Sequence, residues 1–325
     1  MRVAGYSAIR RMPHSRAIQA VPTPLERSRV ADAATCAAMP CLYVSNADTF
    51  GGSWVTEYRV SADGDAPPVF SISLSAEAIP GLALDAARNV YATNLFGDSI
   101  TVFAAGTSSA IRTISGLNTG LNAPNGIALG RNGNAFVANY GGSVTGYSAG
   151  ANGNVAPFRT IAGSNTGLNG PYGIATDALG SGIVYVANRY GGPSKTGSIT
   201  VYAGGTNGNV APIRTIAGSN TGIAGPYGVA VDAQGSIYVA NGSGNTITIY
   251  APSANGNVAP IRAISGHLDS PTGIVLGAQG NIYVANQGGN NVMVFGKGAN
   301  GSDPPIRTII GQRTALDFPS GLAVR

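Results

Sequence analysis

The sequence predicts an all-β protein, a six-bladed β-propeller whose blades are four-stranded antiparallel sheets. Three observations lead to this fold. Glycine supplies 48 of the 325 residues and charged residues only 10%, which is typical of a turn-rich chain with stacked sheets. One segment that opens on Pro-x-Gly recurs along the chain, as in repeat architectures. Each copy holds four short runs of alternating apolar residues, separated by Gly, Asn and Asp.

The four runs of each copy are expected to form strands a to d of one blade. In the clearest copy, strand a lies within 226–232, strand b within 236–241 and strand c within 245–250, and strand d follows the turn at 255–257. One such sheet cannot bury both of its faces, so copies must stack, and radial stacking gives a propeller. The opening proline of strand a recurs at Pro80, Pro124, Pro171, Pro226, Pro271 and Pro319, in a shortened motif at the first of these.

Strand b sets the number of blades. It occurs six times and always ends in asparagine, at Asn46, Asn94, Asn139, Asn188, Asn241 and Asn286. No strand a precedes the first copy, and the chain ends at 319–325 with a strand a that nothing follows. We therefore expect the C-terminal strand to join the first blade, which closes the ring and removes the edges of an open sheet.

Charge divides the chain into two expected parts, a flexible basic segment at 1–41 and the propeller at 42–325. The first part contains Glu26, Asp32 and six arginines, at Arg2, Arg10, Arg11, Arg16, Arg27 and Arg29. It therefore accounts for +4 of the net charge of +5, and the propeller is nearly neutral. The sequence pI of about 9.3 is thus no sign of a nucleic-acid-binding domain.

Residues 1–41 carry no clear targeting signal. Pro and Arg interrupt every apolar run, whereas a secretory signal needs about 7–15 consecutive apolar residues. No run approaches the roughly 18 apolar residues of a membrane span. The compartment stays open: the protein is cytoplasmic, or it is exported from a natural start that differs from this one.

Cys36 and Cys41 fit either a local disulfide or free thiols, but not a zinc site.

A consensus can be read from the copies: Pro-x-Gly-(Ile/Val)-Ala-x-Asp, then (Ile/Val)-Tyr-Val-Ala-Asn, then Asn-x-(Ile/Val)-x-(Val/Ile)-(Tyr/Phe). It resembles the NHL repeat of six-bladed propellers, and the resemblance covers roughly 42–325. This implies the fold but not the function, because that family and its relatives include lyases, lactonase-like hydrolases, protein-binding sensors and RNA-binding domains.

In a blade of this kind, the b–c and d–a connections meet at one face, here called the top face. The asparagines that end strand b should ring the channel there, where they could bind a ligand or the backbone of their own b–c turn. Because every blade has one, the structural role is favoured. As candidate binding residues we nevertheless retain Asn94, Asn139, Asn188, Asn241 and Asn286.

Top-face positions that vary between blades are more informative than the repeated asparagines. Tyr172 and Tyr227 occupy the middle of Pro-x-Gly, and Tyr140 and Tyr190 follow strand b. These tyrosines gather over the middle blades, with Phe96 and Arg189 nearby. Rigid aromatic surfaces suit carbohydrate or peptide contact, although ordinary packing of the rim explains them equally well.

Acidic residues supply the second hypothesis, a calcium or other divalent-cation site. The candidate metal ligands are Asp48, Glu77, Asp98, Asp269 and Asp317. Sugar-lactone hydrolases of similar architecture hold a divalent cation through Glu, Asp and Asn, but none of these residues matches that family's site position by position. The two histidines, His14 and His267, are too few for a multi-histidine zinc centre.

Two further repeated features are given structural roles. The Asp-Gly-Asp and Asn-Gly-Asn segments, with Asp63, Asp65 and Asp303 beside them, are expected to serve as tight turns rather than calcium sites. Strand d carries an arginine in five blades, and we expect this belt to cover the outermost strand. Its members are Arg112, Arg159, Arg214, Arg262 and Arg307.

The predicted function is therefore non-catalytic recognition of a protein, peptide or glycan at the top face. The alternatives are a divalent-metal-dependent, lactonase-like hydrolase at the channel mouth and a scaffold with no small ligand. No catalytic residue is assigned, and a divalent cation such as calcium is the only cofactor considered. Nucleic acid is not expected, because only Arg189, Lys195 and Arg313 oppose the acidic residues of the top face, which is closer to neutral or acidic than basic. We expect a monomer without a membrane span.

Overall fold

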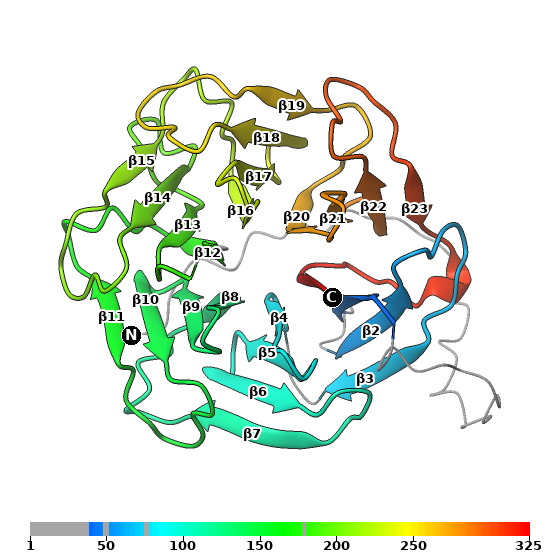
Figure 1. Ribbon diagram of the computed structural model, residues 1–325, viewed down its shortest axis with the longest axis horizontal. Helices are drawn as coiled ribbons and strands as arrows, with labels where there is room; N and C mark the ends of the chain where they lie inside the picture. Colours follow the sequence, from blue (N-terminus) through cyan, green and yellow to red (C-terminus); the bar gives the residue numbers. More distant parts are fainter. Residues whose placement is uncertain (1–38, 48–51, 75–77, 178–179) are drawn as a thin grey trace, which may run out of the picture. The chain divides into compact units, whose positions relative to one another are not determined.

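The computed structural model describes residues 39–47, 52–74, 78–177 and 180–325. These residues form six four-stranded antiparallel sheets arranged in a ring, which confirms the predicted six-bladed all-β propeller (Figure 1). The described helical structure is one short 3-10 turn, η1 (Gln312–Thr314). No helix in the described part of the chain is long and apolar enough to cross a membrane.

Each blade runs from strand a at the axis to strand d at the circumference. The strands, in this order for blades 1 to 6, are β24 (Leu322–Val324), β1 (Cys41–Ala47), β2 (Ser53–Arg59), β3 (Phe70–Leu74); β4 (Leu82–Leu84), β5 (Val90–Asn94), β6 (Ser99–Phe103), β7 (Ala110–Ser115); β8 (Pro124–Leu129), β9 (Ala135–Asn139), β10 (Ser143–Tyr147), β11 (Arg159–Ala162); β12 (Pro171–Thr176), β13 (Val184–Asn188), β14 (Ser198–Tyr202), β15 (Arg214–Ile216); β16 (Pro226–Val231), β17 (Ile237–Asn241), β18 (Thr246–Tyr250), β19 (Arg262–Ile264); β20 (Pro271–Leu276), β21 (Ile282–Asn286), β22 (Asn291–Phe295), β23 (Arg307–Ile309).

Blade 1 is completed by the end of the chain, as predicted. Strand β24 pairs antiparallel with β1, and the Cys41 and Arg325 backbones exchange hydrogen bonds of 2.7 and 3.0 Å. A further bond joins the Ser45 N–H to the Gly321 carbonyl at 2.9 Å. Cys41 is disulfide-bonded, while Cys36 lies outside the described residues.

The core lies between neighbouring blades rather than in one central cluster. For example, Ile247 and Ile249 of β18 pack in one buried cluster with Ile282 and Val284 of β21. Strand alternation produces this arrangement, because each sheet must bury both of its faces against a neighbour. The stacking also explains the low charge content, since few sheet faces remain for solvent.

Glycine in Pro-x-Gly allows the six inner strands to approach one another around the axis. A Cβ at Gly228 would lie 2.3 Å from the Thr272 carbonyl oxygen of the next blade, and one at Gly173 would lie 2.4 Å from that of Tyr227. No side chain fits at such distances. The repeat therefore selects glycine at this position for close packing, and the channel stays narrow.

The Asx-Gly segments of the c–d loops connect blades as well as turning the chain. In five of the six blades, the c–d loop reaches back to strand d of the preceding blade. There an Asx side-chain oxygen accepts a backbone N–H at 2.8–3.2 Å, and the following glycine N–H donates to the carbonyl of the same strand residue at 2.6–2.8 Å. We call this contact the staple. The pairs of strand residue and loop Asx are Thr113 and Asn152, Thr160 and Asn207, Thr215 and Asn255, Ala263 and Asn300, and Thr308 and Asp63.

The strand-d arginines act together with the staples. Arg262 donates to the Lys297 and Ala299 carbonyls at 2.8 and 3.1 Å, and Arg159 donates to the Thr206 and Ala203 carbonyls at 2.5 and 2.9 Å. Arg159 is 4% exposed, and its burial lowers the pKa of the guanidinium. We expected the arginines to lie outward over strand d. At these two positions the guanidinium instead bonds the c–d loop of the next blade.

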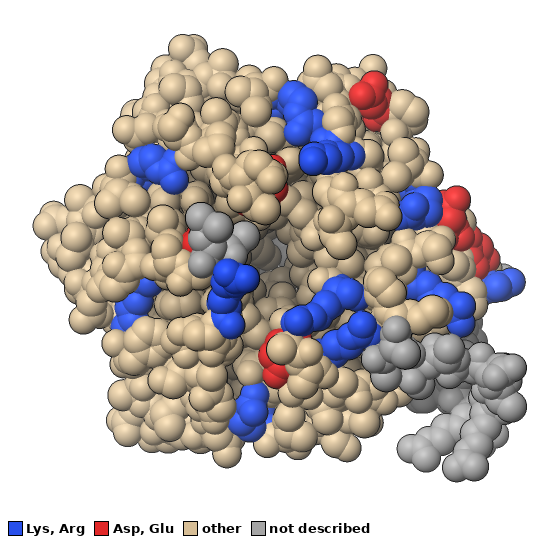
Figure 2. Space-filling model, in the orientation of Figure 1, with Lys and Arg blue, Asp and Glu red and all other residues tan. Residues whose placement is uncertain are grey.

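The channel opens on the face where the chain ends. Figure 2 shows this face, with a hollow at the centre of the ring and Lys and Arg scattered around it among fewer Asp and Glu. We call it the bottom face. The candidate tyrosines and the strand-b asparagines lie at or beside the strand ends of the opposite, top face.

Candidate binding surface at the top face

Five of the six strand-b asparagines are buried and serve the blade itself. Asn188 is fully buried; its Oδ1 accepts the Asn169 N–H at 3.2 Å, and its Nδ2 donates to the Thr200 hydroxyl at 2.9 Å. Asn241 repeats this pattern with the Ala224 N–H at 3.2 Å and the Thr248 hydroxyl at 3.0 Å. The side-chain oxygens of Asn46, Asn139 and Asn286 accept the corresponding loop N–H groups.

These bonds revise the expected structural role. The amides anchor the d–a loop that precedes strand a of the same blade, rather than their own b–c turn. Asn94 is the exception, because it is half-buried and its Oδ1 accepts the Gly97 N–H of its own b–c turn at 3.0 Å. We therefore leave the buried asparagines out of the proposed binding surface.

The four candidate tyrosines come together in two pairs. The rings of Tyr172 and Tyr227 meet edge to face, with centroids 4.6 Å apart. Those of Tyr140 and Tyr190 also meet edge to face, at 6.4 Å, and their hydroxyls lie 3.3 Å apart. The first pair comes from strands β12 and β16, whereas the second follows β9 and β13. Blades 3, 4 and 5 thus contribute to one surface.

Arg189 joins the two pairs. Its guanidinium carbon lies 4.6 Å from the ring centroid of Tyr227 and 5.5 Å from that of Tyr190. Such a cation over aromatic faces is favourable and holds the guanidinium in place. We call Tyr140, Tyr172, Arg189, Tyr190 and Tyr227 the tyrosine cluster. Sequence reasoning noted Arg189 but did not select it, although its place directly after Asn188 was a usable signal.

Burial raises the pKa of Tyr227, while the charge of Arg189 acts in the opposite direction. The ring is therefore neutral at physiological pH and able to donate through its hydroxyl. Tyr190 is 42% exposed, so the cluster has both a sheltered and an accessible end. A surface with this gradient suits a ligand that lies across the rim.

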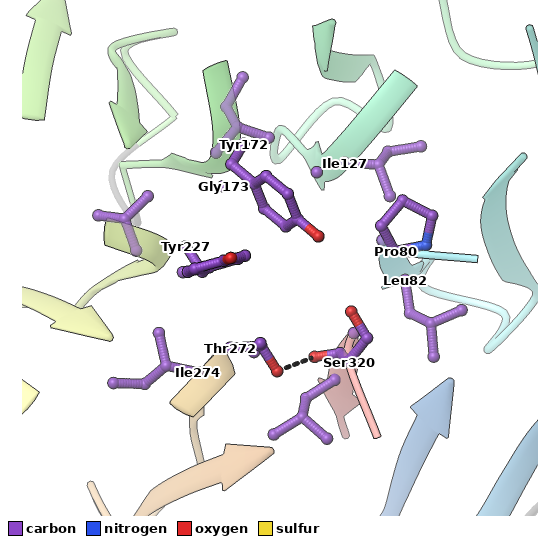
Figure 3. Close-up of a pocket in the computed structure, with 17 residues that line it drawn as sticks. Pro80, Leu82, Ile127, Tyr172, Gly173, Tyr227, Thr272, Ile274 and Ser320 are labelled. Carbon is purple, nitrogen blue, oxygen red and sulfur yellow. Dashed lines mark hydrogen bonds between the residues drawn. The ribbon is translucent and has the colours of Figure 1, made fainter. Parts of the chain in front are cut away.

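Tyr172 and Tyr227 also line the channel mouth. Figure 3 shows the Tyr172 ring reaching over the channel, with Tyr227 beside it and Thr272 and Ser320 on the opposite side. The cavity there has a volume of about 70 Å³. Pockets that enclose a drug-sized ligand have about 300–1,000 Å³. The mouth therefore accepts a few waters or one small group, and a larger ligand at this end of the channel must lie over the top face.

The candidate metal ligands do not converge in the described part of the chain. Asp98 accepts the Ala123 N–H at 2.7 Å, and the Asp269 N–H is held by Asn286 at 2.6 Å. Asp317 lies in another blade, and Asp48 and Glu77 lie outside the described residues. Among the residues described, no three Asp, Glu, His or Cys side chains gather as metal ligands would. The metal-site hypothesis gains no support from this geometry.

No family model and no curated protein sequence matches the chain. Solved structures match it over most of its length. A structure titled as the nidogen/laminin complex matches with a TM-score of 0.65 and 19% identity, over 88% of this chain and 98% of that chain. A protein of unknown function from Bacteroides caccae matches at 0.64 and 11%, over 88% and 98%. A streptogramin B lyase matches at 0.57 and 14%, over 87% and 86%.

At these identities the neighbours show the fold alone, and their titles name both a protein complex and an enzyme. The fold is thus shared with binding and enzymatic proteins, and function must be argued from the site. The resemblance to the NHL repeat stays a prediction.

Proposed function

We propose that the protein is a non-catalytic recognition module that engages a protein, peptide or glycan at its top face. The observation that supports this proposal is the tyrosine cluster, in which three blades contribute aromatic side chains to one surface. Tyrosine offers a large contact area and a polar hydroxyl with little loss of side-chain entropy, so it is common at recognition sites.

Arg189 points to the chemistry of the partner. Its guanidinium is stacked on Tyr227, and no described carboxylate pairs with it. A planar guanidinium with free N–H groups binds carboxylate oxygens in a bidentate manner. We therefore expect the preferred partner to present a carboxylate, as an acidic side chain, a chain terminus or an acidic sugar does, next to a flat or apolar group.

An array of peptides and glycans, each set including acidic and neutral members, tests the proposal. We expect the wild-type protein to bind acidic members, and Tyr172→Ala and Tyr227→Ala each to weaken that binding about tenfold or more, as is usual for buried aromatic contacts. Arg189→Gln should reduce the preference for acidic members.

Phe158→Ala is the matched control, because Phe158 is 49% exposed on the bottom side of blade 3. Binding that survives both tyrosine substitutions would overturn the proposal.

A further inference from the structure

One blade lacks the staple that covers the outer edge of the others. In blades 2 to 6, strand d is bonded by the c–d loop of the next blade. Strand d of blade 1 is β3, and the loop in the corresponding place is 104–109 of blade 2. This loop reads Ala-Ala-Gly-Thr-Ser-Ser, is shorter than its counterpart at 148–158, and has no Asx-Gly-Asx sequence.

The 104–109 loop bonds within its own blade. The Ala104 N–H donates to the Ser109 carbonyl and the Thr107 N–H to the Ala104 carbonyl, both at 3.1 Å. The Ala105 N–H donates to Asn89 Oδ1 at 3.3 Å. These bonds close the loop on blade 2, so it does not extend to β3.

The outward backbone groups of β3 are the ones that a staple would bind. Ile72 is buried like Ile114 of β7, so Ser71 and Ser73 occupy the places of Thr113 and Ser115. Ser71 and Ser73 are exposed, and beyond the pairing of β3 with β2, the described residues make no hydrogen bond to their backbone groups. An edge of this kind is a template for another strand.

The arginine that accompanies the staples is also missing from this blade. Phe70 stands where β7, β11 and the later d strands carry arginine. With Val69 and Leu74 it packs, half-buried, against the cluster between blades 1 and 2. At the other edges, apolar residues on either side of the staple glycine pack against the corresponding cluster. Ala151 and Val155, for example, pack against the cluster between blades 2 and 3. Blade 1 thus presents an edge and an adjoining apolar surface at the same place.

We propose that β3 is the docking edge for an extended segment of another protein that carries an Asx-Gly-Asx turn between small apolar residues. The segment pairs with β3 in the parallel sense seen at the five other edges. Its first Asx oxygen accepts the Ser71 N–H, and its glycine N–H donates to the Ser71 carbonyl. Its glycine carbonyl accepts the Ser73 N–H. The apolar residues on either side cover Phe70 and Leu74, as in other cases where a strand adds to a sheet edge.

A second copy of this chain does not supply such a segment from its described residues. Its five staples are bonded to its own strands. Its remaining Asn-Gly-Asn, at 132–134, forms the turn between β8 and β9, where the Gly130 N–H donates to the Asn134 carbonyl at 2.9 Å. The full sequence contains no other Asx-Gly-Asx segment, so the occupant is a different polypeptide.

A peptide with the sequence of residues 148–158 provides the probe, because it contains a complete staple. We expect a fluorescein-labelled peptide to bind the full chain in a polarisation assay, and the peptide with Asn152→Ala and Asn154→Ala to bind at least tenfold more weakly. Hydrogen exchange at the Ser71 and Ser73 amides should slow about tenfold when the peptide is present at ten times its Kd. Equal binding of both peptides, or protection at another edge, would overturn the proposal.

A loop graft supplies the matched variant. When 104–109 is replaced by the sequence of 148–158, the new loop should cover β3, raise the Tm and abolish binding of the peptide. The same graft with both asparagines changed to alanine should leave binding within twofold of the wild type. Unchanged peptide affinity in the graft that keeps both asparagines would contradict the proposal. So would a dimer of the wild-type protein in sedimentation analysis whose Ser71 and Ser73 amides are already protected from exchange.

Discussion

At the scale of single residues, Glu57 distinguishes blade 1 from the others. It lies on β2 with 3% exposure, and its Oε1 accepts the Tyr43 hydroxyl at 2.9 Å. In blades 2, 4 and 6, a strand-d arginine contacts the equivalent tyrosine hydroxyl, as Arg112 contacts Tyr91 at 2.6 Å. Phe70 replaces that arginine in blade 1, so a buried carboxylate takes over as the partner of the tyrosine.

Burial raises the pKa of Glu57, and this outweighs the opposing effects of the Tyr43 hydrogen bond and the charge of Arg88. A raised pKa means that the folded state prefers the protonated form, so stability falls as the pH rises through that pKa. Glu57→Gln removes the buried charge and keeps a hydrogen-bond acceptor. We expect its Tm to exceed that of the wild type by about 2 °C or more at pH 8.

The difference in Tm between Glu57→Gln and the wild type should shrink as the pH is lowered toward 4, because the Glu57 carboxyl is then largely protonated in both the folded and the unfolded chain. Thermal unfolding followed by circular dichroism at several pH values measures it. A difference that grows toward acid pH would contradict the assignment of a raised pKa.

At the scale of elements, the end of strand b fixes the loop that enters the same blade. Each buried asparagine bonds both strand c and the d–a loop, as Asn241 bonds Thr248 and Ala224. The Tyr at the end of strand c supports the same loop, since Tyr250 donates to the Thr221 carbonyl at 2.6 Å and burial raises its pKa to about 12. Top-face loops are thus positioned by buried polar bonds.

Asn241→Ala should therefore destabilise the protein. It leaves the Ala224 N–H and the Thr248 hydroxyl without this partner, and an unsatisfied buried group costs about 1–3 kcal/mol. We expect a Tm lower by about 3–8 °C in differential scanning calorimetry. Asn94→Ala is the matched control, and its effect should be smaller because Asn94 is half-buried and bonds its own turn. Equal losses for the two variants would show that burial of the amide does not matter.

The repeats predicted these elements because each structural demand recurs. Strand number, blade number and the place of closure follow from copies of Pro-x-Gly and of strand b ending in asparagine. The direction of the asparagine bonds was not predictable from one copy, because the d–a loop and the b–c turn both lie beside strand b. The staples were missed for a related reason: Asn-Gly-Asn has sufficient local explanation as a turn, and its bonds reach a strand about 40 residues away, as between Thr113 and Asn152.

The candidate site was predicted only in part. The four tyrosines were selected because they vary between blades, and the structure brings them together in two pairs. Arg189 bridges the pairs through space, across the boundary between blades 4 and 5, which sequence order does not reveal. The absence of a staple over β3 becomes meaningful only when the other five edges are known.

At the scale of the whole molecule, stability depends on closure of the ring. Blade 1 takes its inner strand from the C-terminus, and Leu322 and Ala323 of β24 are 5% and 6% exposed. Gly321 lies against the next inner strand, since a Cβ there would be 2.7 Å from the Pro80 carbonyl oxygen. The strand therefore seals the axis between blades 6 and 2 as well as completing its own sheet.

Deletion of 319–325 should consequently open the ring. The loss includes the backbone bonds to Cys41 and Ser45, each worth about 1 kcal/mol net, and the buried side chain of Leu322, worth about 2–3 kcal/mol. With four such bonds, the total of about 6–7 kcal/mol corresponds to a Tm lowered by about 10 °C or more. Calorimetry of the truncated and full chains measures this, and adding a synthetic 319–325 peptide should restore part of the loss by mass action. An unchanged Tm would refute closure by β24, because the inner edge of β1 would then need no partner.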